Sequence, residues 1–176
     1  ISHQAAYERL RGVLSRLVAM QAPAYDVLGV PATQQGNRHG YLYHFVDANG
    51  FRFGASEIST VDHARVVAGA LVAAEYYPGT EVAQLAQQLM ENTDWNWLYN
   101  GQFLAQGWIE DPAGTFEGGR TLDQWNRYSE LMILLFEAMG HPDPAKAIPA
   151  SAWDNLTYGT GRMFPYEYAH LVPGNA

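Results

Sequence analysis

Two segments of the chain have the apolar content of helices that are buried on every side. The first, STVDHARVVAGALVAAEYYPG, begins with capping-box spacing between Ser59 and Asp62. The second, TLDQWNRYSELMILLFEAMG, ends at Gly140, a residue type that commonly terminates helices. A helix that is apolar all round is usually buried. We therefore predict two inner helices, over residues 60–77 and 122–139.

Two further segments predict helices with a single apolar face. AAYERLRGVLSRLVAM, residues 5–20, and TEVAQLAQQLMENT, within which a helix is expected over residues 81–92, repeat apolar side chains at helical spacing. We expect them to be outer helices that cover the inner pair, with long loops gathered at one end. GYLYHFVDANGFRF predicts a hairpin that turns at Asn49-Gly50, and FLAQGWIE suggests a second hairpin. One short helix is expected within residues 148–158, followed by coil.

Composition excludes several classes of function. The net charge of -8, with only one lysine, disfavours binding to nucleic acid, because phosphate backbones repel acidic proteins. The absence of cysteine excludes disulfides, zinc sites built on cysteine and a cysteine nucleophile. The histidines lack metal-binding spacing, so we predict no metal site. No apolar run approaches the ~18 residues of a membrane span. The 176 residues, 48% of them hydrophobic, suit one domain with a sizeable core.

Two carboxylates within the apolar segments are the strongest candidates for chemistry. Glu130 stands at the head of the unbroken run LMILLF, where burial would raise its pKa as a general acid requires. Its simpler interpretation is a helical ion pair with Arg127. Asp62 lies in the first turn of its helix, where capping and the helix dipole alone also favour an aspartate. Acids in the loops are expected to be solvated: Asp94, Glu110, Asp111 and Glu117.

Aromatic residues are concentrated in the segments between the predicted helices. Singly, each is best explained as filling the core or the gaps between layers. Collectively they favour a cleft, because flat rings are the platforms on which sugar rings pack. The residues of this set are Trp95, Trp97, Tyr99, Trp108, Trp125 and Tyr128.

Five segments together resemble a known family. EISTVDHARVVAGALVAAEYY, ENTDWNW, GWIED, WNRYSELMILLFEAMG and HPDPAKAIPASAW occur in the order and spacing of the glucoamylase-like glycoside hydrolase domain family. That family includes bacterial glucoamylases, endo-β-1,2-glucanases and the related domain of cyclic β-1,2-glucan synthases. The resemblance covers about residues 5–171. It implies an all-α fold, an (α/α)6 toroid, of which residues 1–176 form a single segment from the central part. We expect an incomplete ring that a second chain or a missing segment completes.

The resemblance also implies site residues. Asp62 and Glu130 correspond to acidic positions that line the cleft and are implicated in catalysis in relatives. Some relatives carry another acid three residues before the first position; this chain has Ser59 there, and Glu57 is the nearest alternative acid. In FPYEYAHLV, near the end of the chain, Tyr168 and His170 match the family pattern. The implied substrate-binding residues are Trp95, Trp97, Trp108, Trp125, Tyr128, Tyr168 and His170.

The expected activity is therefore that of a glycoside hydrolase or transglycosylase acting on a glucan, β-1,2-linked in first place and α-linked in second. Glu130 would act either as general acid or as the carboxylate that drives water to the anomeric carbon, with Asp62 as its partner. Acid–base chemistry needs no cofactor. The family points to the bacterial periplasm or secretion, with the cytoplasm as the alternative. The competing hypothesis is a non-catalytic carbohydrate-binding or assembly subunit.

Overall fold

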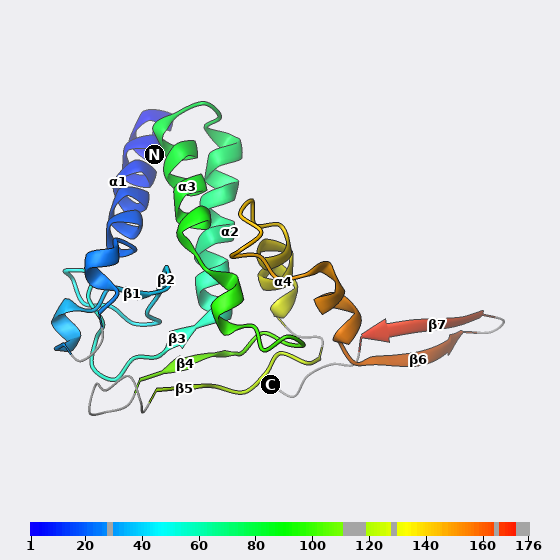
Figure 1. Cartoon of the computed structure of the whole chain (residues 1–176). Coiled ribbons are helices and arrows are strands. Elements are labelled where there is room, and N and C mark those ends of the chain that lie inside the picture. The colour runs from blue at the N-terminus through cyan, green and yellow to red at the C-terminus, as the bar shows by residue number, and fades with distance from the viewer. Residues whose placement is uncertain (28–29, 111–118, 128–129, 164–165, 172–176) are drawn as a thin grey trace.

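Four α-helices form the body of the protein in the computed structural model (Figure 1). They are α1 (His3–Met20), α2 (Thr60–Tyr76), α3 (Glu81–Asn92) and α4 (Leu131–Met139). Helix α3 packs against both α1 and α2, and α4 packs against α2. The structure describes residues 1–27, 30–110, 119–127, 130–163 and 166–171, with only the backbone for residues 158–171.

The first three helices lie where the sequence pattern places them. Ser59 caps α2, since its hydroxyl accepts a hydrogen bond from the backbone N–H of Asp62 at 3.4 Å. Ser2 caps α1 in the same way, accepting from the N–H of Ala5 at 3.2 Å. Gly79, with a φ of 71°, lies in the turn between α2 and α3. The predictions for residues 5–20, 60–77 and 81–92 are confirmed to within two residues.

The fourth helix is half as long as predicted. Arg120–Thr121 form strand β5, and Gln124 makes an isolated bridge with Ala105. The N–H groups of Leu122 and Trp125 donate to carbonyls of the preceding loop, at Gly107 and Leu104, over 2.8 Å each. Because this backbone is committed to strand-like pairing, it cannot also make helical hydrogen bonds. The helix predicted over 122–139 is therefore wrong in its first half.

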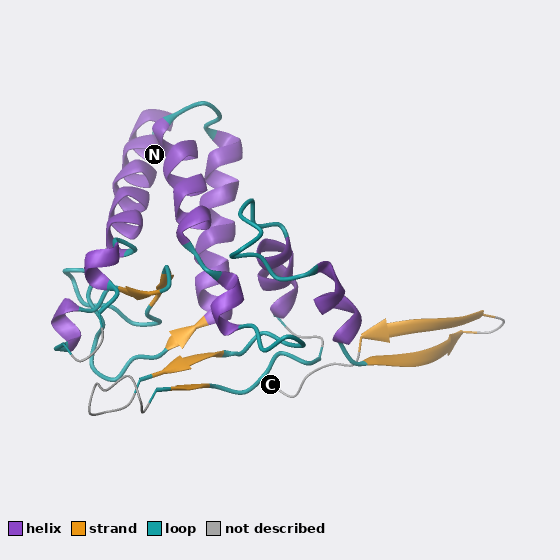
Figure 2. Ribbon diagram, viewed as in Figure 1, coloured by secondary structure: helices purple, strands orange, loops and turns teal. Residues whose placement is uncertain are grey.

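Short antiparallel strands connect the helices (Figure 2). β3 (Ile58–Ser59) pairs with β4 (Gly107–Ile109), and β4 pairs with β5. β1 (Asn37–Arg38) pairs with β2 (Tyr41–Leu42). The segment FLAQGWIE thus contains β4, which pairs antiparallel with the next strand along the chain as the predicted second hairpin requires, and β3 extends this pair to a three-stranded sheet. The turn at Asn49-Gly50 is confirmed in a reduced form, as a single bridge between Val46 and Arg52.

The last strands extend away from the helices. β6 (Tyr158–Met163) and β7 (Tyr166–Leu171) form an antiparallel hairpin that projects from the body (Figure 1). The sequence predicted coil here, which is wrong. The short helix predicted within 148–158 is present as a 3-10 helix at Ala150–Asn155.

The prediction of an all-α fold, part of an (α/α)6 toroid, is contradicted. Inner and outer helices of a toroid alternate around a ring, whereas the described helices follow one another side by side as α1, α3, α2 and α4. Three small sheets accompany them. Contacts with α3 and α4 bury two sides of α2. Val66, Val72 and Tyr76 on the same helix are exposed, so the prediction that this helix is buried on every side is wrong. None of the described helices is long and apolar enough to span a bilayer.

Candidate functional site: a cluster of acidic residues at the start of helix α2

The junction of β3 and α2 gathers the predicted carboxylates. Ile58 is fully buried, so the alternation along the strand turns Glu57 and Ser59 to the opposite side. His44 lies beside them, because its N–H donates to the carbonyl of Glu57 at 2.9 Å. Asp62 follows within the first turn of α2. We call this group, with Arg65 and Glu130 described below, the acid cluster.

His44 lies between two carboxylates of the acid cluster. Its Nδ1 is 2.7 Å from Oε1 of Glu57, and its Nε2 is 3.3 Å from Oδ2 of Asp62. The hydroxyl of Ser59 donates to the same Oδ2 at 2.5 Å. A polar chain therefore runs from Glu57 through His44 and Asp62 to Ser59. Such a chain can hold a proton and pass it between its members.

Arg65 joins the two principal candidates. Its Nη1 is 3.3 Å from Oδ1 of Asp62, and its Nη2 contacts Oε2 of Glu130. Asp62 and Glu130 are separated by 68 residues in sequence (130 − 62), yet one guanidinium reaches both. The side chains of Asp62 and Glu130 are 36% and 57% exposed, so substrate can approach them. The structure thus brings together the two carboxylates that the sequence singles out.

The environment of Glu130 differs from the prediction. Glu130 is the residue before α4, not a member of it, and its side chain is largely exposed. The prediction that Glu130 is buried is therefore wrong. The described ion pair of Glu130 is with Arg65, not with Arg127.

Glu57, the alternative acid, is a member of the acid cluster. Partial burial acts to raise its pKa, but the hydrogen bond with His44 and the other favourable contacts outweigh it, so the pKa lies below its ordinary value. Glu57 is therefore an ionised acceptor at neutral pH. Its contact with His44 fixes the orientation of that imidazole.

The aromatic residues predicted to bind sugar rings differ in burial and in their distance from the acid cluster. Trp95 is fully buried and packs edge-on against Tyr41, with ring centroids 5.3 Å apart, so its assignment to a substrate platform is wrong. Trp125 is half-buried, and its Nε1 donates to Oγ1 of Thr60 at 3.0 Å, directly beside the acid cluster. Trp97 and Trp108 are half-buried and contact each other, with centroids 5.4 Å apart. Of the remaining candidates, Tyr128 lies outside the described residues; Tyr168 and His170 lie on β7, and their side chains are not described.

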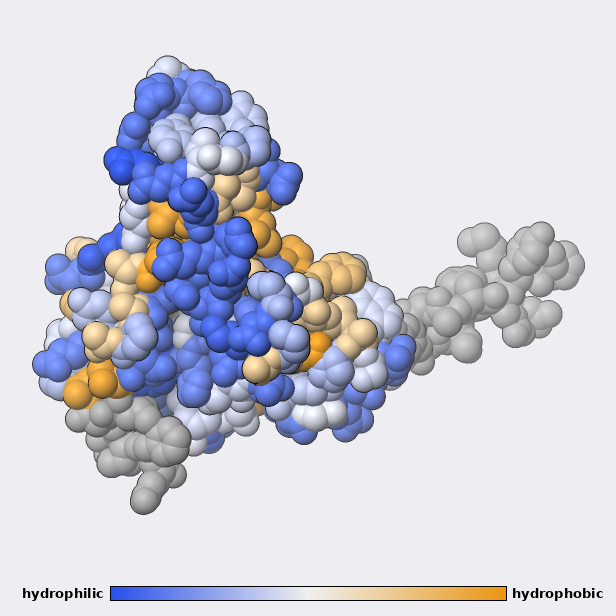
Figure 3. Space-filling view, turned by 45° about the horizontal axis from the view of Figure 1, so that its top comes forward, coloured by the Kyte–Doolittle hydropathy of each residue, from blue (hydrophilic) through white to orange (hydrophobic). Residues whose placement is uncertain are grey.

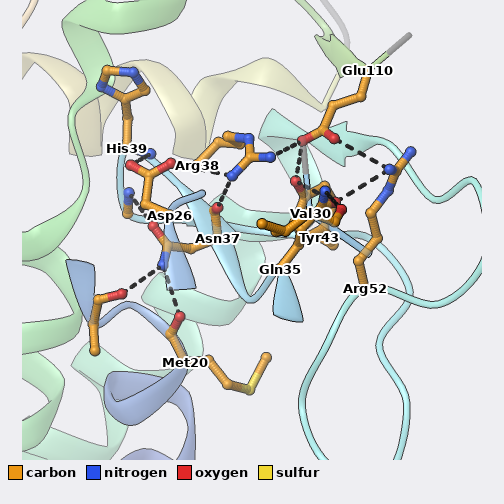
Figure 4. Close-up of polar contacts among 12 residues, drawn as sticks. Met20, Asp26, Val30, Gln35, Asn37, Arg38, His39, Tyr43, Arg52 and Glu110 are labelled. Atoms are coloured by element: carbon orange, nitrogen blue, oxygen red, sulfur yellow. Dashed lines mark hydrogen bonds and ion pairs between the residues drawn. The ribbon is translucent and has the colours of Figure 1, made fainter. Parts of the chain in front are cut away.

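A buried network of charges was not predicted (Figure 4). Glu110, expected to be a solvated loop acid, has a side chain only 2% exposed between Arg38 and Arg52. Its oxygens lie 2.6 Å from Nη2 of Arg38 and 3.2 Å from Nη1 of Arg52. The hydroxyl of Tyr43 donates to Glu110, and burial together with this bond raises the pKa of Tyr43. We call Arg38, Tyr43, Arg52 and Glu110 the arginine–glutamate network.

The arginine–glutamate network contacts the segments of chain next to His44 and Glu57 in the acid cluster. Tyr43 directly precedes His44, and Nε of Arg52 donates to the carbonyl of Ser56 at 2.7 Å, next to Glu57. The network therefore anchors both ends of the loop that carries His44 and Glu57. Spacing along the sequence gives no indication of it, since Arg38, Arg52 and Glu110 come from three separate segments.

A second unpredicted acid lies in the stretch that contains Glu130. Glu137 is buried in α4, neither of its carboxylate oxygens has a hydrogen-bond partner among the described residues, and burial raises its pKa to about 8. Its position three residues after Leu134 and one before Ala138, both fully buried, is the sequence signal that could have identified it.

His63 in α2 is also buried. Its Nδ1 accepts a hydrogen bond from the N–H of Leu42 at 3.3 Å, and its Nε2 lies 2.9 Å from Oγ1 of Thr93. Burial lowers the pKa of His63 to about 3, so the side chain is neutral in the folded protein. No three histidine, aspartate or glutamate side chains in the described part of the chain are arranged to hold a metal ion.

The chain was compared with family models, curated proteins and solved structures, and no relative was found. The resemblance to the glucoamylase-like family stays a prediction, carried by the five segments quoted above.

Proposed function

We propose that the protein cleaves or transfers glycosidic bonds of a glucan, with the acid cluster as its active site. The observation that carries this proposal is the convergence of Asp62, in the first turn of α2, and Glu130, directly before α4, on one accessible site around Arg65. Cleavage of a glycosidic bond uses a pair of carboxyl groups that flank the scissile bond. The five segments shared with the glucoamylase-like family support the same chemistry.

The contacts favour different roles for the two carboxylates. Asp62 is assigned the proton-donating role because His44 links it to Glu57, which gives it a path for protons. Glu130 is assigned the role of nucleophile or base because its contact in the described part of the chain is with Arg65 and not with His44. In the proposed step, a proton passes from Asp62 to the leaving oxygen as the bond to the anomeric carbon breaks. Glu130 then either bonds to that carbon or takes a proton from the attacking water. Arg65 leaves Glu130 when the substrate enters.

The choice of substrate rests on the resemblance. β-1,2-linked glucan is the first candidate and an α-linked glucan the second. Trp125 is the aromatic residue best placed to pack against a sugar ring at the acid cluster, because it contacts the first residue of α2. No cofactor is required for this chemistry. The proposed compartment is the periplasm or the exterior of a bacterium, with the cytoplasm as the alternative.

A panel of linkage-defined glucans, with chromatography of the products, tests the proposal. Glu130→Gln and Asp62→Asn should each lower turnover by about 10²–10⁴-fold, the usual contribution of a positioned acid or base. Glu75→Gln is the matched control, because Glu75 is an exposed acid on the same helix α2, outside the acid cluster. Unchanged turnover in Glu130→Gln would remove the catalytic assignment.

One observation favours the non-catalytic alternative. Arg65 already contacts both carboxylates, as it would in a purely structural ion-pair network. A carbohydrate-binding subunit would retain oligosaccharides on the panel without releasing products, and Glu130→Gln would leave that binding unchanged. Product formation by the unmodified protein excludes this alternative.

A further inference from the structure

A pocket of about 620 Å³ with both polar and apolar walls lies apart from the acid cluster, with which it shares no residue. Its walls come from the end of α1, the segments at residues 22–26 and 37–40, and the end of α3, together with Asp94 and Lys146. Hydrophilic residues dominate the middle of the face drawn in Figure 3. The volume is within the range of small-molecule sites.

The backbone at the pocket is held in an unusual conformation. His39 has a φ of 49°, in the left-handed region that few residues other than glycine adopt. Gly40 follows with a φ of 82°, and a Cβ there would lie 2.1 Å from the carbonyl oxygen of Asn92. The carboxylate of Asp26 holds the turn by accepting from the N–H of His39 at 2.9 Å. Such conformations concentrate at functional sites.

The imidazole of His39 is held by its neighbours. It stacks on Trp97 with centroids 4.5 Å apart and an interplanar angle of 16°. Its Nδ1 lies 3.7 Å from Oδ2 of Asp94, which also belongs to the wall. The side chain remains 43% exposed, so this pre-positioned ring is available to a ligand. Prior positioning reduces the entropy lost on binding.

Charge in and behind the wall is balanced. Asp26 and Asp94 contribute two negative charges and Lys146 one positive charge, while Arg38, 3.3 Å behind Asp26, adds the second positive charge. These four charges sum to zero, so the pocket does not select strongly for an ion of either sign. Hydrogen-bonding groups come from the carboxylates and from the amides of Gln88 and Asn92, and an apolar strip from Val18, Ala22 and Pro23.

We propose that this pocket binds a neutral, hydroxyl-rich ring, such as one glucose unit of an oligosaccharide. Carboxylates and amides pair with hydroxyl groups, and the apolar strip packs against the C–H face of a sugar. Trp97 stacks on His39 and contacts Trp108. Trp108 is the strand partner of Ile58 and lies on the face of the sheet opposite Glu57 and Ser59, so the pocket is separate from the acid cluster. The pocket is an accessory subsite for the substrate class of the proposed function, and the choice of ligand rests on that function.

Titration of the ¹⁵N-labelled protein with a β-1,2-linked glucose tetrasaccharide tests this inference. Amide signals of Gly40, Gln88 and Asp94 should shift. Gln88→Trp, which fills the pocket from an exposed position, should weaken binding at these signals by at least about tenfold, and Gln88→Ala should weaken it less. Gln84→Trp is the control, because Gln84 is exposed one turn earlier on α3 and outside the wall.

The outcomes separate the subsite from the catalytic proposal. Shifts at the pocket without hydrolysis of any glucan would support the subsite and refute the catalysis. Hydrolysis without shifts at the pocket, or with shifts that Gln88→Trp does not reduce, would overturn the subsite alone. Shifts at the pocket produced by inorganic phosphate or spermidine but not by the tetrasaccharide would overturn the neutral-ligand inference.

Discussion

The stability of the protein should depend on pH through two buried groups that act in opposite directions. Glu137 has its pKa raised by burial from 4.5 to about 8, so the folded state keeps a proton that the unfolded state has lost. Its contribution to stability is complete below pH 4.5 and is lost as the pH rises to 8. Burial lowers the pKa of His63 from 6.5 to about 3. Between these pH values the unfolded state binds a proton that the folded state does not bind. Stability therefore falls when the pH drops from 6.5 toward 3.

The magnitudes follow from the free energy of a pKa shift, ~1.4 kcal/mol per pH unit. Between pH 4.5 and 6.5 the two slopes have equal size and opposite sign, so the free energy of unfolding should be nearly constant. From pH 6.5 to 8 only Glu137 titrates, and the protein should lose about 2 kcal/mol. Glu137→Gln removes this loss, and its stability should instead rise by about 3 kcal/mol from pH 4.5 to 6.5 and then stay level. His63→Asn should show the converse, a continuous fall of about 5 kcal/mol from pH 4.5 to 8.

Urea denaturation followed by tryptophan fluorescence, at half-unit steps from pH 4.5 to 8.5, measures these profiles. The comparison uses the shape of each curve, so a constant offset caused by either substitution does not matter. If Glu137→Gln still loses about 2 kcal/mol between pH 6.5 and 8, the burial argument for Glu137 is wrong.

Three further predictions concern the framework of the sites. Glu110→Ala should destabilise the protein by about 3–5 kcal/mol in denaturant titrations, because it leaves the buried guanidinium of Arg52 without its counter-charge and that of Arg38 with Asp26 alone; a loss below 1 kcal/mol would mean that water already solvates the arginine–glutamate network. Trp95→Ala should cost about 3–5 kcal/mol by the same measurement, while oligosaccharide affinity at the acid cluster stays within twofold; the reverse order of effects would restore Trp95 as a sugar platform. Gly40→Ala should lower the melting temperature, because the added Cβ collides with the carbonyl of Asn92; an unchanged melting temperature would contradict the close approach.

Local signals predicted the elements whose hydrogen bonds are local. The start of α2 was predictable from Ser59 and Asp62, which are three residues apart. The hydroxyl of Ser59 accepts a hydrogen bond from the backbone N–H of Asp62 and so caps the helix. The pairing of residues 120–125 with residues 104–109 depends on partners outside the local segment, and periodicity cannot detect such partners. Helix α4 begins at Leu131, so Glu130 lies just before the helix and its side chain is exposed. Residues 131–136 are apolar, as the sequence shows, but the inference that the whole segment 122–139 is a buried helix was wrong.

The candidate site was predictable in its members and not in its electrostatics. Asp62, Glu57 and Glu130 were identified from the sequence, and they lie together. The residues that connect them, His44 and Arg65, carry no motif of their own, because each acts through a contact made only in the folded chain. The same holds for Glu110, which the sequence does not distinguish from an ordinary acid, whereas Glu137 has one local signal, its spacing three residues after Leu134.

The arginine–glutamate network has a consequence for the order of folding. It joins Glu110 to Arg52 and Arg38 across 58 and 72 residues of chain (110 − 52 and 110 − 38). Closing loops of that length is slow compared with forming the turns of α1, α2 and α3. We expect the network to be assembled after the rate-limiting barrier. Substitutions within it should then accelerate unfolding and leave the refolding rate nearly unchanged, so that the contacts behind the acid cluster determine how long the folded state persists.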